Sequence, residues 1–285
     1  MCEFSSAKPN VNPRSQLVLS LFPGIDLFGR AFAAAGFVVV RGPDLITGDD
    51  IRDFAGVRGR FDGIIAGPPC QGFSSANRFR NDPGHKSVRY SMEMLGEFRR
   101  AVLESEPVWW ALENVPAVPD VCIAGYRVQR VPISDTEAGG AQIRTRHIQF
   151  GHRDGFIIRP DRKNDAVNRR AKSGPVPVAT TTKPVSKWQT FSSHCRKQGI
   201  DPSTLKLPGF TKEAKFRAIG NGVPLSIGRA VAAAVAVAGP PDSSDCPCGC
   251  GRRLSGRKRA ATASCRKRLQ LRRETNPVNQ PKVDQ

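Results

Sequence analysis

The feature that most constrains the fold of this chain is an alternation of short apolar runs with helical segments. The runs are rich in β-branched and aromatic residues and have the length of buried strands. Between them, residues 29–36 are rich in alanine and end at a glycine, and residues 91–105 repeat apolar side chains at helical spacing. The strand candidates are LVLSLF (17–22), FVVV (37–40), FDGIIAG (61–67) and VWWAL (108–112).

Strands that alternate with helices predict an α/β fold built on a doubly wound, mostly parallel sheet. Two later segments, YRVQRV (126–131) and RHIQF (146–150), have the pattern of further strands, and residues 223–238 have that of a helix. Residues 151–207 are polar and basic and show little periodicity, so we expect a separate small region with long loops there.

The charge of the chain indicates a polyanionic partner. Its 285 residues include 44 Lys and Arg against 25 Asp and Glu, which gives a formal net charge of +19. Ten of these cations lie in residues 252–273, which contain no acid. Nucleic acid is the simplest partner for such a surface.

The sequence also indicates the cellular compartment in which we expect the protein. We find no signal-peptide core at the start of the sequence and no apolar run of about 18 residues, so we expect a cytoplasmic protein that does not cross a membrane. In that reducing environment the eight cysteines are not expected to form a disulfide framework.

Polar sequence follows three of the predicted strands at the edge where open α/β sheets bind ligands. The sequences are SLFPGID (20–26), GPPCQGFS (67–74) and ENV (113–115). Pro68 and Pro69 restrict the backbone before Cys70, whose thiolate form would be a nucleophile. Glu113, beside a hydrophobic strand end, would have a raised pKa and act as a proton donor.

In QIRTR (142–146), Arg144 and Arg146 are two positions apart, and on a strand both would project from the same face to brace a carboxylate or a phosphate. Each of these signals is weak alone, because most cysteines after strands are buried or inert and alternate arginines commonly mark a solvated face. Their joint occurrence, in this order and at strand ends, indicates a catalytic site.

The motifs resemble those of the cytosine carbon-5 DNA methyltransferases of bacterial or phage type. SLFPGID is similar to the family's first motif, GPPCQGFS to its Pro-Cys-Gln motif, and ENV to the motif of the catalytic glutamate. QIRTR and AIGNGVP (218–224) match two further motifs, so that the resemblance covers residues 17–238.

The resemblance implies a Rossmann-like methyltransferase fold with S-adenosylmethionine as cofactor and double-stranded DNA as substrate. It implies that Cys70 attacks carbon 6 of a flipped cytosine, that Glu113 holds ring nitrogen 3, and that Arg144, with Arg146, orients Glu113 or the phosphate of the target. The residues that it implies for cofactor binding are Phe22, Gly24, Ile25, Asp44, Asp50, Ile51, Pro68 and Asn221.

The chain departs from the family pattern at three places. Ser20 stands where the first motif usually begins with Asp, and Asp26 stands where glycine is common. Gly42 stands where the second strand normally ends in an acid that binds the ribose hydroxyls, and Asp44 follows two residues later. These departures affect the expected cofactor affinity more than the catalytic identity.

The same resemblance implies a division into five segments. They are a disordered N-terminus (1–15), a catalytic and cofactor-binding part (16–150), a target-recognition region (151–207), a return to the catalytic part (208–238), and a linker with a cysteine-rich basic tail (239–285). In the tail, four cysteines lie within about 20 residues. Either they form a tetrahedral zinc site, or the tail is a disordered basic segment in which the cysteines are incidental. These cysteines are Cys246, Cys248, Cys250 and Cys265. Either form would strengthen nonspecific DNA binding.

Two other functions remain open from the sequence. A methyltransferase of the same fold acting on transfer RNA is one, because a fold does not fix its substrate. A catalytically weak DNA-binding or regulatory protein is the other. A nicotinamide-dependent dehydrogenase fits poorly, because no G-x-G-x-x-G follows the first strand. Nothing in the sequence indicates an oligomer, so we expect a monomer, with or without a paired restriction nuclease.

Overall fold

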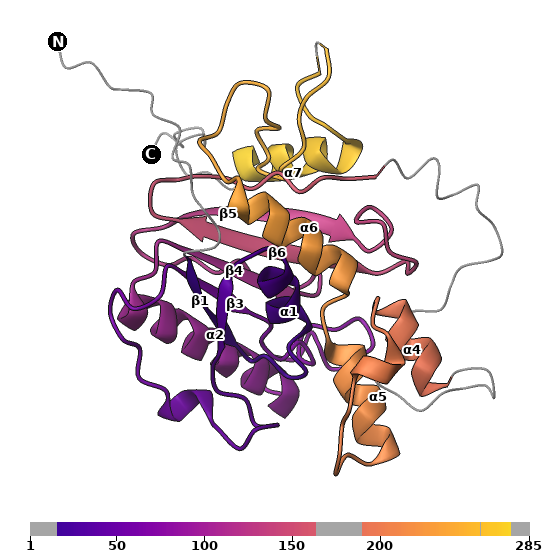
Figure 1. Ribbon diagram of the computed structural model, residues 1–285. Helices are drawn as coiled ribbons and strands as arrows, with labels where there is room; N and C mark the ends of the chain where they lie inside the picture. Colours follow the sequence, from indigo (N-terminus) through magenta and orange to yellow (C-terminus); the bar gives the residue numbers. More distant parts are fainter. Residues whose placement is uncertain (1–15, 164–189, 257, 275–285) are drawn as a thin grey trace.

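A six-stranded mixed sheet forms the centre of the protein (Figure 1). The computed structural model describes residues 16–163, 190–256 and 258–274. The strand order is β2-β1-β3-β4-β6-β5; β2, β1, β3 and β4 are parallel to one another, and β6 is antiparallel to both β4 and β5. The strands are β1 (Leu17–Leu21), β2 (Val38–Arg41), β3 (Gly63–Ala66), β4 (Trp109–Asn114), β5 (Arg127–Ser134) and β6 (Thr145–His152).

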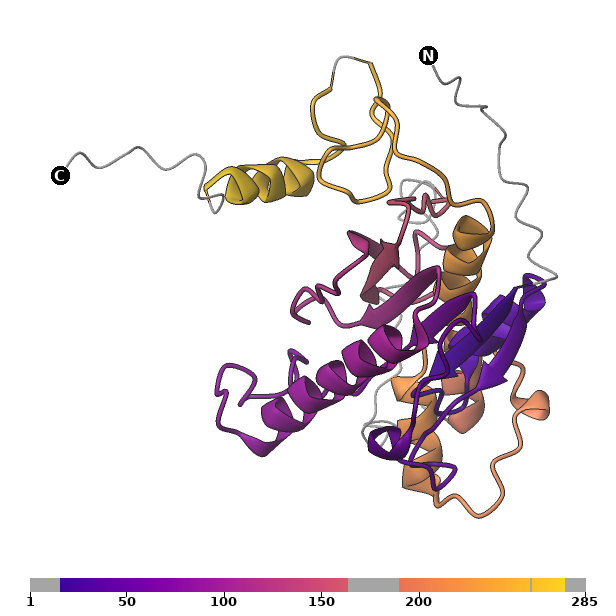
Figure 2. The same cartoon turned by 90° about the vertical axis from the view of Figure 1, so that its left-hand side faces the viewer.

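Helices cover both faces of this sheet, as the views in Figures 1 and 2 show. The helices are α1 (Leu27–Ala34), α2 (Lys86–Ser105), α4 (Phe191–Lys197), α5 (Lys212–Asn221), α6 (Leu225–Ala236) and α7 (Ala263–Glu274), with short 3₁₀ turns η2 (Ile51–Asp53) and η3 (Pro202–Thr204). The predicted doubly wound, mostly parallel α/β fold is therefore confirmed, and β5 and β6 add an antiparallel pair at one edge.

Side chains alternate between two hydrophobic cores because successive residues of a strand face opposite sides of the sheet. Val18, Ile65 and Trp109 pack with α1 and α6 on one side. Leu19, Ile64 and Trp110 pack with α2 on the other. Burial on both faces explains why these strands have continuous apolar sequences.

Two tryptophans of β4 pack closely over glycines in the neighbouring strands β3 and β6. Trp109 is in register with Gly63 of β3, and Trp110 is in register with Gly151 of β6. A Cβ atom at either glycine would come within 2.2 Å of the facing indole ring. Both glycines are therefore required by close approach of a buried ring, one on each face of the sheet.

Some of the predicted segments lie wholly or partly outside the residues that the structure describes. The predicted disordered N-terminus (1–15) and residues 164–189 of the predicted recognition region lie outside the described residues. In the described remainder of that region, α4 and η3 pack against α5 through the apolar cluster of Ile25, Cys195 and Ile219. The division into five segments stays a prediction.

One described stretch, Lys212–Ala236, is long and apolar enough by composition to be considered a membrane span. It consists of two helices, α5 and α6, and 61% of its most apolar window is buried inside the protein. Ile227 and Val231 of α6 belong to the core cluster that includes α1. The apolar face of this stretch is thus accounted for by the internal packing of the fold.

We predict opposite effects of alanine at two glycines. Gly151→Ala should lower the free energy of unfolding by about 2–3 kcal/mol, because Trp110 is fully buried and has no room to move. Gly96→Ala is the matched control: Gly96 lies exposed within α2, a Cβ there meets nothing within 4 Å, and the substitution should stabilise the protein by about 0.5–1 kcal/mol. Urea unfolding of both variants measures this; equal effects would contradict the proposed contact.

Candidate active site

A pocket of about 1000 Å³, including its open mouth, lies at the carboxyl ends of β1, β3 and β4. Its walls are the ends of β4 and β6 and the segments that follow β1, β2, β3 and β4, together with residues of α2 and of the end of α5. All eight residues predicted to bind the cofactor line it: Phe22, Gly24, Ile25, Asp44, Asp50, Ile51, Pro68 and Asn221. Cys70, Glu113 and Arg146 line the same pocket.

Several contacts hold the loop that carries Cys70. Asn114 donates its side-chain amide to the carbonyl of Pro68 at 3.1 Å. Directly after Cys70, the backbone N–H of Gly72 donates to Ser91 Oγ of α2 at 2.9 Å, and a Cβ atom at Gly72 would come within 2.7 Å of the α2 backbone. Proline before the cysteine and close packing behind it limit the freedom of the sulfur atom.

Glu113 is buried at the end of β4 and pairs with a cation from β6. Its Oε1 lies 2.8 Å from Nε of Arg146, and the residue is 6% exposed. Burial raises the pKa of the Glu113 carboxyl above its usual value, and the positive charges of Arg146 and Arg144 oppose that rise. A carboxyl with a raised pKa is a better proton donor near neutral pH than an exposed one.

The thiol of Cys70 is half-buried in the same electrostatic environment. Burial raises its pKa first, the nearby Glu113 carboxylate raises it further, and Arg146 and Arg144 act in the opposite direction. In the free protein the sulfur is therefore held mainly as the neutral thiol, and a change in the charge of Glu113 alters its ionisation.

Arg144 and Arg146 do not lie side by side on a strand as the spacing suggested. β6 begins only at Thr145, and a turn in which the N–H of Arg144 donates to the carbonyl of Gln142 precedes it. Arg146 reaches Glu113, whereas Arg144 is buried and donates to the carbonyl of Gly220 at 2.8 Å. Burial, and then the charge of Arg146, lower the pKa of Arg144 to about 10.

Buried amides extend this network to α4. Gln142 donates to the carbonyl of Lys197 at 2.6 Å, and Gln198 donates to the carbonyl of Ile219 at 2.7 Å. Gln198 and Arg144 thus hold the last turn of α5, which brings Asn221 to the pocket. The role of this motif in joining α4 and α5 to the sheet could not be predicted from the sequence.

The departures from the family pattern have local structural explanations. Asp44 lines the pocket and accepts the backbone N–H of Gly24 at 2.7 Å, so it supports the turn after β1. At Gly42 a Cβ atom would meet Leu21 and Leu19 at about 3.0–3.1 Å. The carboxylate on this side of the pocket therefore belongs to Asp44, as the sequence suggested.

Asp26 supplies beside position 20 the carboxylate that Ser20 lacks. Ser20 Oγ donates to Oδ1 of Asp26 at 2.9 Å, and the same carboxylate accepts the N–H of Gly29 at the start of α1. A carboxylate is thus present beside position 20, but it comes from the loop instead of the strand. Asp26 has a positive φ of 59°, which is costly for a side chain other than glycine and is offset by these bonds.

The pocket also contains residues that were not among the predicted site residues, and Asn114, Tyr90 and Met94 are examples. Asn114 follows Glu113 within ENV and was the one with an available signal. Tyr90 and Met94 come from α2, and only the three-dimensional path of that helix brings them to the site.

Comparison with known proteins supports one family. Residues 44–121 match the model of the family described as C-5 cytosine-specific DNA methylase. The chain is 33% identical over 119 residues to type II methyltransferase M.HgiDI of Herpetosiphon aurantiacus, which is 38% of this chain and 36% of that protein. It is 28% identical over 116 residues to type II methyltransferase M1.HphI of Haemophilus parahaemolyticus, covering 35% and 29% of the two chains.

The matches to the two type II methyltransferases cover about a third of the length of those relatives. The residues matched by the family model, 44–121, include Cys70 and Glu113. Over residues 44–121 the chain is therefore similar to the C-5 cytosine-specific DNA methylase family.

Two solved structures share the fold. A methyltransferase of Entamoeba histolytica, EhMeth, superposes with a TM-score of 0.53 over 75% of this chain and 96% of its own, at 12% identity. A putative DNA modification methyltransferase encoded within an Escherichia coli prophage gives a TM-score of 0.52 over 78% and 98%, at 17% identity. At these identities the comparison establishes the fold alone.

We predict that the reactivity of Cys70 depends on the charge of Glu113. Because burial and Glu113 raise the pKa of the thiol, alkylation of Cys70 by iodoacetamide should be slow near pH 7 and should accelerate as the pH rises past the usual thiol range. At a fixed pH high enough to ionise Glu113, Glu113→Gln removes the negative charge and should speed alkylation by roughly ten-fold. Mass spectrometry of the Cys70 peptide measures the rate.

Glu93→Gln, on the exposed surface of α2, is the control for this experiment and should leave the rate unchanged. An unchanged rate in Glu113→Gln would show that the two groups are not coupled.

Proposed function

We propose that this protein transfers a methyl group from S-adenosylmethionine to carbon 5 of cytosine in DNA. The observation that carries the proposal is the placement of Cys70 and the Glu113–Arg146 pair in one pocket with all eight residues predicted to bind the cofactor. The match of residues 44–121 to the C-5 cytosine-specific DNA methylase family and the similarity to type II methyltransferases support the same reaction.

The residues of the pocket fit S-adenosylmethionine. The ring of Phe22 and the side chains of Ile25 and Ile51 offer apolar contacts for an adenine, and Asp44 and Asp50 offer carboxylates for hydroxyl and amino groups. The bound cofactor would supply an electrophilic methyl group.

Cys70 would make carbon 5 of the cytosine reactive. The thiol would first lose its proton to solvent, and the thiolate sulfur would then bond to carbon 6 of the ring while the electron pair of the 5,6 double bond moves toward carbon 5. Carbon 5 would then bond to the methyl group as the bond between that group and the sulfonium sulfur breaks, which leaves the donor as a neutral thioether. Loss of the proton on carbon 5 restores the double bond and expels the Cys70 sulfur.

Glu113 would control the charge on the base during this attack. Its carboxyl gives a proton to ring nitrogen 3, which offsets the negative charge that the incoming sulfur brings to the ring. The raised pKa of Glu113 supports this direction of proton transfer. Arg146 would hold the carboxyl in place through the 2.8 Å contact, and Arg144 would fix the loop of Asn221 as a positioning residue.

DNA is the substrate that the family and the charge favour. The matched relatives are type II methyltransferases, and the chain carries a net charge of +19. Because carbon 6 is inaccessible in a stacked duplex, the target base would have to be flipped into the pocket. We propose that the protein acts on double-stranded DNA as a cytoplasmic monomer, with target recognition in residues 151–207.

We predict methyl transfer from isotopically labelled S-adenosylmethionine to DNA, detected as 5-methylcytosine by mass spectrometry of nucleosides. Cys70→Ser should reduce the rate by more than about a thousand-fold, because serine is a far weaker nucleophile. Cys122→Ser, at an exposed cysteine outside the pocket, should retain activity.

Transfer RNA is offered in a parallel reaction with the same preparation. Label only in RNA would assign the other substrate that the sequence left open. Label in neither polymer, from a folded protein, would reject the enzymatic proposal in favour of a DNA-binding or regulatory role.

A further inference from the structure

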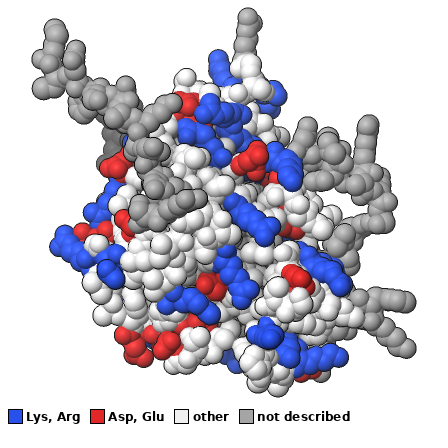
Figure 3. All heavy atoms as spheres, in the orientation of Figure 1, with Lys and Arg blue, Asp and Glu red and all other residues white. Residues whose placement is uncertain are grey.

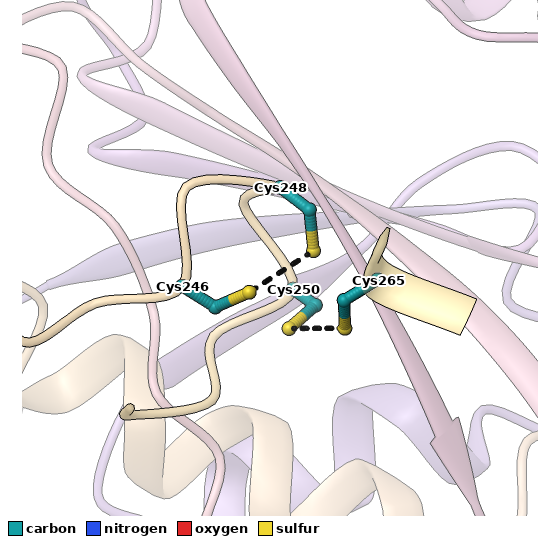
Figure 4. Close-up of side chains that lie close together, drawn as sticks. All are labelled: Cys246, Cys248, Cys250 and Cys265. Carbon is teal, nitrogen blue, oxygen red and sulfur yellow. Dashed lines mark hydrogen bonds between the residues drawn. The ribbon is translucent and has the colours of Figure 1, made fainter. Parts of the chain in front are cut away.

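The C-terminal segment, residues 240–256 and 258–274, brings four thiols together outside the active site. Cys246, Cys248 and Cys250 come from a tight loop and Cys265 from the first turn of α7, and Figure 4 shows the four sulfur atoms converging on one point. All their Sγ atoms lie within 4.8 Å of one another. The segment sits beyond the β5 edge of the sheet (Figures 1 and 2).

The sulfur spacing fits tetrahedral coordination. Sγ of Cys246 lies 3.5 Å from that of Cys248, and Sγ of Cys250 lies 3.6 Å from that of Cys265. In a tetrahedron with metal–sulfur bonds of about 2.3 Å, neighbouring sulfurs are about 3.8 Å apart. The four thiols are thus at nearly the separation that a zinc ion requires.

Burial makes the cluster unusual for a segment of this composition. Among the described residues 240–274, the four cysteines are the only buried side chains, each 3% exposed or less. The cluster around them adds only the partly buried Leu254, Ala260, Ala261 and Leu269. So small an apolar core gives little stability, and small folds of this kind depend on a metal or on covalent links.

Polar donors surround the sulfurs as they do in thiolate metal sites. The N–H of Ala261 lies 3.3 Å from Sγ of Cys246, and the hydroxyl of Thr262 lies 3.0 Å from Sγ of Cys265. A guanidinium nitrogen of Arg268 lies 3.7 Å from Sγ of Cys248. Such donors stabilise negative charge on a sulfur that binds a metal, whereas they give little stabilisation to a neutral thiol.

We propose that Cys246, Cys248, Cys250 and Cys265 bind one zinc ion, which folds the C-terminal segment and fixes it to the sheet. Four thiolates in tetrahedral array select zinc or iron, and zinc is the ordinary structural ion for such a set. Gly249 and Gly251 have φ values of 76° and 71°, so the Cys-x-Cys-x-Cys loop has the tight turns needed to aim three sulfurs inward.

Contacts on either side attach this centre to the catalytic part. Arg252, two residues after Cys250, pairs with Glu137 at 2.6 Å, and Glu137 also pairs with Arg162 at 2.8 Å. A Cβ atom at Gly251 would come within 2.7 Å of the carbonyl of Ile158, so the loop lies directly against that backbone. With zinc bound, the C-terminal segment would therefore be rigidly attached to the catalytic part and would not be a free tail.

Elemental analysis of the full chain, purified under reducing conditions, tests the metal. We predict one zinc per chain, and tetrahedral thiolate absorption bands after replacement by Co²⁺. Cys248→Ser with Cys265→Ser should lose the metal and make the segment sensitive to limited proteolysis, whereas Cys122→Ser should retain both properties. No metal after incubation with Zn²⁺, iron in place of zinc, or two disulfides would each overturn the proposal. None of these outcomes depends on methyltransferase activity.

The zinc site would also present a positively charged surface to DNA, a consequence that rests on the proposed function. Between Cys246 and Leu271 the sequence has no acidic residue. Lys258, Arg259, Arg266 and Lys267 are exposed and have no acidic partner among the described residues. Figure 3 shows Lys and Arg side chains at the top of the view, over this segment. Phosphates of the DNA backbone are the complementary ligand.

We predict that Lys258→Gln with Arg266→Gln weakens binding to double-stranded DNA and lowers the slope of log Kd against log salt by about 2. The control, Arg60→Gln with Arg99→Gln, removes the same charge from exposed sites outside the segment and should leave the slope unchanged. Equal slopes in both variants would reject the DNA contact while the zinc measurement stands independently. Loss of methylation with an unchanged slope would concern the catalytic proposal alone.

Discussion

The site depends on β4, the strand at which the parallel and antiparallel halves of the sheet meet. β4 runs parallel to β3, so its carboxyl end lies beside that of β3, where Cys70 follows. It runs antiparallel to β6, so the same end faces the start of β6 and Arg146. A buried carboxylate requires a compensating charge, and this change of strand direction supplies it from a distant part of the sequence.

The sequence was sufficient for the architecture because its strands are buried on both faces and its motifs follow them directly. It was insufficient where the structure of a segment depends on the strand or side chain that it contacts elsewhere in the fold. The pattern of residues 126–131 and 146–150 indicates strands, but nothing in it says that they pair antiparallel with each other. The spacing of Arg144 and Arg146 implied a common face, yet β6 begins between them, and this boundary decides which arginine meets Glu113.

The departures from the family pattern illustrate why a motif should be compared in space as well as along the chain. Taken singly, Ser20 is a lost acid and Asp26 an added one. In the structure their side chains share a hydrogen bond, so the two changes exchange the source of one carboxylate. Gly42 and Asp44 show a similar displacement of an acid by two residues, because the backbone at Gly42 lies against Leu19 and Leu21. The polar character of the cofactor side is thereby retained.

The chain uses cysteine in two physically different environments. Cys70 stands alone after two prolines, and burial, followed by the nearby Glu113 carboxylate, raises the pKa of its thiol. The four C-terminal cysteines face one another and are surrounded by donors that favour permanent negative charge. A lone thiol with a tunable pKa suits a bond that must form and break in each cycle, whereas clustered thiolates suit a bond that should persist. Residue type alone does not separate these uses; the neighbours of each sulfur do.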